Sequence, residues 1–106
     1  MEGKKTGKGK FEFVGGFYEG DFVDGQFHGI GKYYFSETGK VYEGEFRNNN
    51  MEGKGVMTWP DQSKYEGEFK KGKKYGYGVM TYSNGDVYEG YWKDDIRSGF
   101  GTLKTK

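Results

Sequence analysis

The sequence repeats one short pattern four times, and this repeat constrains the fold more than any other feature. The tripeptide Tyr-Glu-Gly begins at residues 18, 42, 65 and 88, which gives units of 23 or 24 residues. A fixed period of this length is the signature of a repeat architecture. We therefore expect a single domain covering residues 1–106. It consists of a partial unit at 7–17 and full units at 18–41, 42–64, 65–87 and 88–106.

Each unit is long enough for two β-strands and too short to hold a crossover helix as well. Two strands of about 5–6 residues and two turns account for its length. Parallel neighbours need a crossover of a dozen or more residues, so neighbouring strands must be antiparallel. We therefore predict an all-β fold: a single-layer, twisted, antiparallel meander of β-hairpin repeats with about nine strands and no helix. Strands spaced ~4.8 Å apart would make a ribbon about 40 Å long.

Side chains alternate between the two faces of a strand, so the repeat assigns each residue to a face. In every unit the aromatic residues of the first strand share a face with one another, and acidic residues occupy the opposite face. A continuous apolar face requires both strands of a unit to point their large residues to the same side. In the second full unit that face is made of Tyr42, Gly44, Phe46, Gly53, Gly55, Met57 and Trp59.

Two kinds of turn are needed to keep the large side chains of successive strands on the same face. Inside a unit, a two-residue hairpin loop at Asn48–Asn49 suffices, and Asp24-Gly25, Lys71-Gly72 and Asp94-Asp95 are equivalent. Between units, Tyr82 and Tyr88 share a face if the pairing is centred on Gly85. That geometry predicts an odd-length loop with a bulge, because a strict two-residue turn would place Tyr88 on the wrong side.

Glycine makes up 21 of the 106 residues, and most of it recurs in phase with the aromatic residues. Glycine inside a strand normally weakens pairing. A bare Cα also lets an aromatic ring lie flat over the backbone of a neighbouring strand. We therefore expect the repeated glycines to lie on the aromatic face, beneath rings. The alternative is that glycine only marks turns.

The composition excludes several classes of protein. Basic and acidic residues nearly cancel, 17 against 16, whereas nucleic-acid binding needs a local excess of Lys and Arg. The chain has no cysteine, so disulfides and thiolate metal sites are excluded. Mean hydropathy is −1.03, yet 20% of the residues are aromatic, which disordered chains are not. The polar, basic residues 1–10 do not have the form of a secretion signal, and we expect a cytoplasmic location.

The order Tyr-Glu-Gly-(Asp/Glu)-Phe, polar turn, Gly-x-Gly and aromatic residue resembles the MORN (membrane occupation and recognition nexus) repeat. The resemblance covers residues 7–103, and the last unit departs from it at Tyr91, Trp92 and Thr105. It implies a non-catalytic adaptor whose groove binds partner segments, in a family found at the cytoskeleton, at cilia and at membrane junctions. It implies no particular partner.

No catalytic or metal-binding set is evident in the sequence. His28 is the only histidine, and we expect it to be a half-exposed residue of a turn or strand end. The acidic residues that recur with Glu19 and Asp21 are expected to form cross-strand charge pairs on the outer face. A phosphate-binding loop would need a helix after the glycines, and none is predicted. We therefore predict that the protein is not an enzyme and uses no cofactor or metal.

The favoured hypothesis is a scaffold that holds a protein or peptide partner against a row of aromatic side chains. Buried aromatic residues dominate the binding energy of interfaces. Trp59 and Tyr82 are the best candidates for direct contact, since some of the others must cover glycines instead. The candidate residues are Tyr18, Phe22, Tyr33, Phe35, Tyr42, Phe46, Met57, Trp59, Tyr65, Phe69, Met80, Tyr82, Tyr88 and Trp92.

Two alternatives remain open. One is peripheral binding to anionic membrane lipids, because each basic residue near such a surface adds about 1 kcal/mol. The other is self-assembly into a homo-oligomer through exposed end strands or aromatic faces. Nucleic acid is not an expected partner. The lysines available for lipid contact are Lys4, Lys5, Lys8, Lys10, Lys70, Lys71, Lys73 and Lys74.

Overall fold

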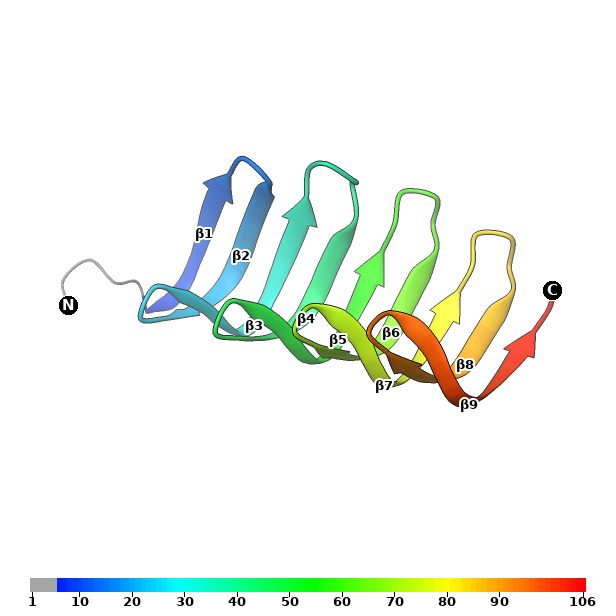
Figure 1. Cartoon of the computed structure of the whole chain (residues 1–106). Coiled ribbons are helices and arrows are strands. Elements are labelled where there is room, and N and C mark those ends of the chain that lie inside the picture. Colours follow the sequence, from blue (N-terminus) through cyan, green and yellow to red (C-terminus); the bar gives the residue numbers. More distant parts are fainter. Residues whose placement is uncertain (1–5) are drawn as a thin grey trace.

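The computed structural model describes residues 6–106, and this part of the chain contains nine β-strands and no helix (Figure 1). The predicted lipid-contact residues Lys4 and Lys5 lie outside the described residues. The strands are β1 (Gly7–Phe13), β2 (Gly16–Val23), β3 (Gln26–Phe35), β4 (Val41–Arg47), β5 (Asn50–Thr58), β6 (Lys64–Lys70), β7 (Lys73–Thr81), β8 (Val87–Lys93) and β9 (Ile96–Lys104).

The strands form one open sheet in which each strand pairs antiparallel with its neighbours in the chain. The predicted single-layer antiparallel meander of nine strands is therefore confirmed. The array measures 52 × 25 × 17 Å. Because the strands pair only with their neighbours in the chain, each unit is stabilised mainly by the units beside it, as in other repeat proteins.

The turns inside the units are the two-residue loops that the sequence predicts. In the second unit Arg47 pairs with Asn50, which leaves Asn48 and Asn49 in the turn. Both have positive φ, 47° and 70°, as the type I′ hairpin requires. Asn and Asp tolerate this left-handed conformation better than other non-glycine residues, which accounts for the composition of these turns.

The turns between units differ from the prediction. Met80, rather than Tyr82, pairs with Tyr88, so the loop at residues 82–86 is centred on Asn84 and not on Gly85. The Tyr82 N–H donates to the Asp86 carbonyl oxygen at 2.8 Å and closes a five-residue loop. The length of this loop is odd, as expected, but β7 and β8 pair without a bulge. The observed register differs from the predicted one by two residues. Side chains on a strand return to the same face every two residues, so Tyr82 and Tyr88 still share a face. The loop at residues 35–40, between Tyr34 and Val41, has an even length.

The bulges lie inside the units instead. Gly44 pairs with Gly55, whereas Phe46 pairs with Met51, so that Glu45 faces three residues of β5. Gly53 lies in this bulge with φ +84°, and a Cβ added to it would approach the Glu45 carboxylate to 2.8 Å. The prediction that Gly53 and its equivalents lie beneath aromatic rings was therefore wrong. These glycines supply the left-handed backbone of the bulge.

The other repeated glycines do lie beneath tyrosine rings, as predicted. A Cβ added to Gly55 would come within 2.4 Å of the Tyr42 ring, and the same is true of Gly31 under Tyr18. Gly78 and Gly101 lie against Tyr65 and Tyr88 in the same way. Each Gly-x-Gly element therefore combines two functions, a bulge glycine followed by a glycine that makes room for a ring.

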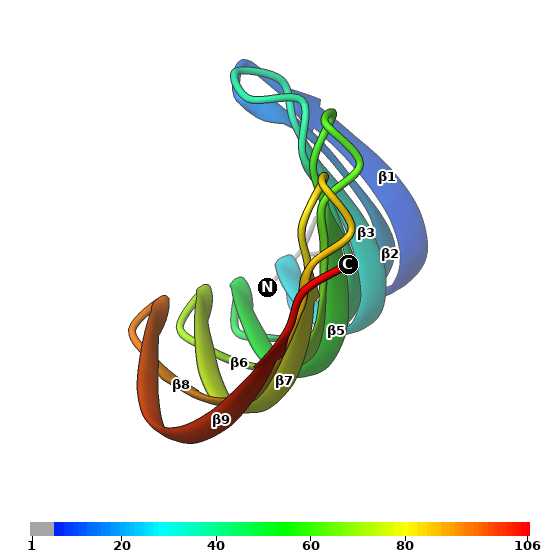
Figure 2. The same ribbon diagram turned by 90° about the vertical axis from the view of Figure 1, so that its right-hand side faces the viewer.

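The sheet curls along its strands into a trough (Figure 2). A contact between side chains of the aromatic face on its two arms shows that this face lies on the inside. Lys74 lies at the start of β7 and Trp59 just beyond the far end of β5, yet the Lys74 Nζ is 5.3 Å from the centre of the Trp59 ring. The two ends of the strands therefore approach each other across the concave face. Bulges increase strand bending, and the absence of side chains at the paired glycines permits close curvature.

The curl buries most of the aromatic face without a second layer. Tyr18, Tyr42 and Tyr65 are fully buried at 0% exposure. Each tyrosine ring packs edge-on against an aromatic ring of its own unit and one of the next, for example Tyr42 with Phe46 at 5.1 Å and with Phe69 at 4.9 Å between ring centres. A single layer therefore encloses most of its own aromatic face because it is curled, and the face stays partly accessible at residues such as Trp59 and Tyr82.

Candidate functional site

The inside of the trough forms a concave groove that runs along the array. We define the groove by the side chains that remain accessible between the two arms of the curled sheet or pack over its buried rings. They are Phe13, Phe27, Tyr33, Phe35, Met51, Trp59, Lys74, Tyr82 and Arg97.

The fourteen predicted contact residues fall into two groups. Four of them, Tyr33, Phe35, Trp59 and Tyr82, are partly buried and keep accessible ring surface in the groove. The remaining ten form the buried core, and in this conformation they shape the groove from beneath. They are Tyr18, Phe22, Tyr42, Phe46, Met57, Tyr65, Phe69, Met80, Tyr88 and Trp92.

Buried tyrosine hydroxyls fix the core rings. Tyr42 donates its hydroxyl hydrogen to the Glu45 carbonyl oxygen at 2.8 Å, and Tyr65 donates to that of Glu68 at 2.9 Å. Burial, with a smaller contribution from the Glu68 carboxylate, raises the pKa of Tyr65 to about 12. These hydroxyls therefore stay protonated at neutral pH and act as structural donors.

The N-terminal half of the groove contains two hollows between apolar side chains. One, of about 320 Å³, is lined by Phe11, Phe22, Gly25, Phe27 and Asn49. The other, of about 150 Å³, lies between Phe35 on one arm and Met51 on the other. Neither is lined by a charged residue. Apolar hollows of this kind suit hydrophobic side chains of a ligand.

The C-terminal half of the groove carries cations that lie over aromatic rings. The Lys74 Nζ is 5.3 Å from the ring centre of Trp59 and 5.5 Å from that of Trp92. Its side chain is 16% exposed, and Asp95 approaches at 3.8 Å. Burial lowers the pKa of Lys74, and the nearby Lys40 lowers it further, while Asp95 opposes the shift.

Arg97 repeats this arrangement one unit further along. Its guanidinium lies 4.3 Å from the ring centre of Tyr88 and 5.4 Å from that of Tyr82. It also donates a hydrogen bond to the Tyr82 hydroxyl. Cation–π contacts of this type contribute ~0.5–2 kcal/mol, more where water is excluded. Lys74 and Arg97 therefore form part of the surface that a ligand in this half of the groove would meet.

Several lysines of the two clusters that the sequence singled out have acidic or aromatic neighbours. Lys8 pairs with Asp21 at 2.8 Å, and Lys10 lies 3.7 Å from Glu12. In the second cluster, Lys71 lies in a hairpin turn and Lys74 in the groove. Lys70 and Lys73 pair across that turn, so only Lys74 of this cluster is directed into the groove.

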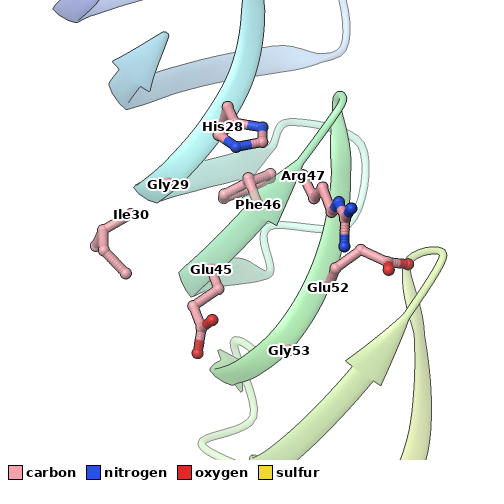
Figure 3. Close-up of a pocket in the computed structure, with 8 residues that line it drawn as sticks. All are labelled: His28, Gly29, Ile30, Glu45, Phe46, Arg47, Glu52 and Gly53. Carbon is pink, nitrogen blue, oxygen red and sulfur yellow. The ribbon is translucent and has the colours of Figure 1, made fainter. Parts of the chain in front are cut away.

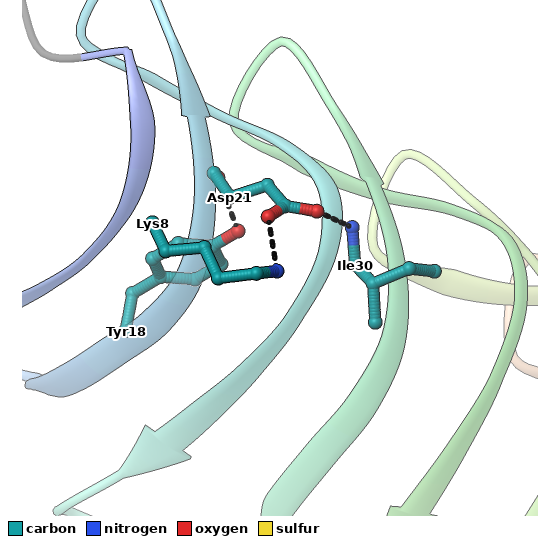
Figure 4. Close-up of polar contacts among 4 residues, drawn as sticks. All are labelled: Lys8, Tyr18, Asp21 and Ile30. Atoms are coloured by element: carbon teal, nitrogen blue, oxygen red, sulfur yellow. Dashed lines mark hydrogen bonds and ion pairs between the residues drawn. The ribbon is translucent and has the colours of Figure 1, made fainter.

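The acidic residues of the outer face serve the bulges. The Asp21 carboxylate accepts the Ile30 N–H at 3.0 Å and the Lys8 ammonium at 2.8 Å (Figure 4). The hydrogen bond from Lys8 is the main cause that lowers the pKa of Asp21. Glu45 and Glu68 accept the N–H groups of Lys54 and Tyr77 in the same way, both at 3.1 Å. These carboxylates satisfy N–H groups that the bulges remove from the ladder, in addition to the charge pairs that were predicted.

His28 lines a depression of about 510 Å³ between two bulges (Figure 3). The two carboxylates in this hollow already accept backbone N–H groups, Glu45 from Lys54 and Glu52 from Lys71. Within residues 6–106 no cluster of three metal-ligating side chains occurs. The same residues include no helix that could cross a membrane. The depression offers no pair of free acid and base groups.

Sequence reasoning missed the cations of the groove. Lys74 was assigned to a surface cluster, and Arg97 was assigned no role. The sequence does contain a signal for these cations, at the position that pairs with the second aromatic residue of each unit. From the first full unit to the last, this position is occupied by Phe27, Met51, Lys74 and Arg97. Comparison of that position across the units would have found a change from apolar to basic along the array.

The fold and groove define a class of protein, a single-layer β-repeat module in which four similar hairpins share one aromatic core. The chain belongs to the MORN repeat family, which matches it at residues 1–16, 18–38, 42–64, 65–87 and 88–105. This repeat is a non-catalytic module associated with membrane and protein binding. A comparison with curated proteins gives no match for this chain.

Proposed function

We propose that this protein is a non-catalytic adaptor that holds a segment of a partner protein in the concave groove. The observation that carries the proposal is the accessible ring surface of Tyr33, Phe35, Trp59 and Tyr82, aligned on one concave side of a rigid core. Aromatic side chains that are held in place contribute most to binding energy at interfaces. Rigid placement also reduces the entropy lost when a ligand binds.

The size of the groove suits a peptide segment. The array is 52 Å long, and an extended chain spans ~3.4 Å per residue, so about 15 residues would lie along it. The hollows between Phe27, Phe35 and Met51 are large enough for apolar side chains. We therefore expect the ligand to be an extended or helical segment that contributes apolar residues to these hollows.

Peptide selection with a fluorescence readout tests this proposal. Peptides of about 15 residues are selected from a random library against the whole chain, and their binding is followed by tryptophan emission. Trp59 faces the groove whereas Trp92 is buried, so a bound peptide should shift the emission of Trp59. We expect the double substitution Phe35→Ala and Tyr82→Ala, which keeps the Trp59 reporter, to weaken binding at least about tenfold.

The matched control replaces two exposed aromatic residues of the outer face, Tyr77→Ala and Phe100→Ala. This control should bind the selected peptides like the wild type. Selected peptides that bind the folded groove variant with unchanged affinity would place the binding site elsewhere. Anionic vesicles serve as a parallel probe, since salt-sensitive binding to vesicles in the absence of peptide binding would favour the lipid alternative.

A further inference from the structure

The concave groove changes chemically from one end to the other. At the position opposite the second aromatic residue of each unit, the first two units carry Phe27 and Met51, and the last two carry Lys74 and Arg97. The four positions are structurally equivalent, so the change does not come from the fold. It divides the groove into an apolar half and a cationic half.

The cationic half has an excess of positive charge. Lys40 lies at the boundary between the two halves, because its Nζ is 4.8 Å from the centre of the Phe35 ring and its charge also acts on Lys74. Among residues 6–106, Asp95 is the only carboxylate that forms an ion pair with any of Lys40, Lys74 and Arg97. Three cations therefore face one carboxylate in this part of the groove.

The cations are held in fixed positions. Lys74 is largely enclosed by rings, and Arg97 is fixed by the Tyr82 hydroxyl and by the Tyr88 ring beneath it. The backbone N–H of Lys74 also donates to Asp95 at 2.8 Å, so one face of that carboxylate is already occupied. Cations that are already ordered lose little side-chain entropy when an anion approaches. A carboxylate brought by a ligand would meet Lys74 where access of water is reduced and Arg97 where the side chain is exposed.

We infer that the groove takes a partner segment that is apolar at one end and acidic at the other. Its apolar side chains lie against Phe27, Phe35 and Met51, and its Asp or Glu side chains lie against Lys74 and Arg97. This inference rests on the proposed function and adds the chemical class and the direction of the ligand. Charge complementarity selects the partner, since a basic segment would be repelled from the last two units.

The selected peptides test this inference through their own sequences. We expect Asp and Glu to be enriched in one half of each peptide and apolar residues in the other. Replacing the acidic residues of such a peptide by Asn and Gln should weaken its binding to the wild-type chain at least about tenfold. That loss should shrink when NaCl is raised from about 0.05 M to about 0.5 M, because salt screens charge pairs. This arm needs no protein variant and so cannot fail through misfolding.

The second arm changes the protein. Lys74→Met combined with Arg97→Met introduces the residue that the second unit already carries at Met51. We expect this variant to bind acidic peptides at least about tenfold more weakly and to bind their neutral versions like the wild type. Lys32→Gln with Lys54→Gln removes two exposed lysines of the outer face as a charge-matched control.

The outcomes separate this inference from the proposed function. Peptides that shift Trp59 emission but carry no excess of acidic residues, or that bind the Lys74→Met/Arg97→Met variant as tightly as the wild type, would overturn the inference and leave the groove as the binding site. If no selected peptide shifts Trp59 emission, both the inference and the proposed function are contradicted. Vesicle binding that depends on Lys74 and Arg97, without peptide binding, would assign these cations to lipid headgroups.

Discussion

At the scale of single residues, a tyrosine ring above a glycine is the main structural device. Tyr42 lies over Gly55 of the next strand, and its hydroxyl hydrogen is donated to the Glu45 carbonyl oxygen. The ring shields backbone hydrogen bonds that glycine leaves exposed. The contact therefore requires both residues together. A residue larger than Gly55 would collide with the ring, and a residue smaller than Tyr42 would leave the backbone uncovered.

Substitution of Gly55 tests this device. The change Gly55→Ala would place a Cβ 2.4 Å from the Tyr42 ring, so either the ring or the strand must move. We expect the free energy of unfolding to fall by about 2–3 kcal/mol, as in other overpacked sites, measured by urea denaturation. Gly15→Ala is the control, because its Cβ would meet nothing closer than the Phe13 ring at 3.3 Å. Equal losses in the two variants would contradict the account.

The buried tyrosines also predict how stability depends on pH. Burial raises the pKa of Tyr18 and that of Tyr65 to about 12, and it raises that of Tyr42 as well. The unfolded chain ionises these groups near pH 10. Stability should therefore be complete below about pH 10 and fall between about pH 10 and pH 12, by ~1.4 kcal/mol per pH unit for each tyrosine.

Urea denaturation at a series of alkaline pH values measures this fall. The triple variant Tyr18→Phe, Tyr42→Phe and Tyr65→Phe should be less stable at neutral pH because three carbonyl groups lose their donors. Its stability should nevertheless decline less steeply in the alkaline range. A decline as steep as that of the wild type would show that other groups govern alkaline unfolding.

At the scale of elements, the hairpins β2–β3, β4–β5 and β6–β7 each contain a bulge closed by an acidic side chain. Glu45 accepts the Lys54 N–H from the opposite face, and Asp21 and Glu68 do the same in their units. The bulge bends the hairpin toward the concave side and so brings the two arms of the sheet together. The acidic residues of the outer face thus contribute to the groove on the inner face.

Replacement of one such carboxylate should weaken the hairpin without abolishing the fold. We expect Glu45→Ala to lower the free energy of unfolding by about 1 kcal/mol, because one backbone N–H loses its acceptor in a partly solvated site. Glu45→Gln should retain most of the stability, since its side-chain oxygen can still accept. Glu43→Ala, on the same strand and likewise exposed, removes no acceptor of a bulge N–H and should stay within about 0.5 kcal/mol of the wild type. Thermal or urea unfolding distinguishes the three, and a larger effect at Glu43 than at Glu45 would refute the assignment.

At the scale of the whole molecule, the rings form one continuous chain of contacts across the units. Tyr18 contacts Phe46, Tyr42 contacts Phe69 and Tyr65 contacts Trp92, with ring centres 4.9–5.5 Å apart. Each unit therefore completes the core of the unit before it. Strand β9 has no unit after it in the structure, and every residue in it is exposed.

This arrangement predicts a gradient of local stability along the array. Amide hydrogens in β4, β5 and β6 should exchange slowest, because these strands have neighbours on both sides, and those in β9 should exchange fastest. Hydrogen exchange followed by mass spectrometry measures the gradient. The replacement Phe69→Ala removes the ring shared by Tyr42 and Tyr65 and should raise exchange on both sides of β6. Uniform exchange over all nine strands would contradict a quasi-one-dimensional array.

The sequence alone determined the number of strands, their antiparallel order, the two-residue turns and the position of the ring above Gly55. These features depend on the repeat period and on side-chain alternation, which are local. The tertiary structure decided how far the sheet curls, that the bulges lie inside the units, and that only Tyr33, Phe35, Trp59 and Tyr82 of the predicted contact residues stay accessible. It also placed Lys74 and Arg97 over aromatic rings. Curvature brings together residues from opposite ends of different strands, and no local pattern records such distances.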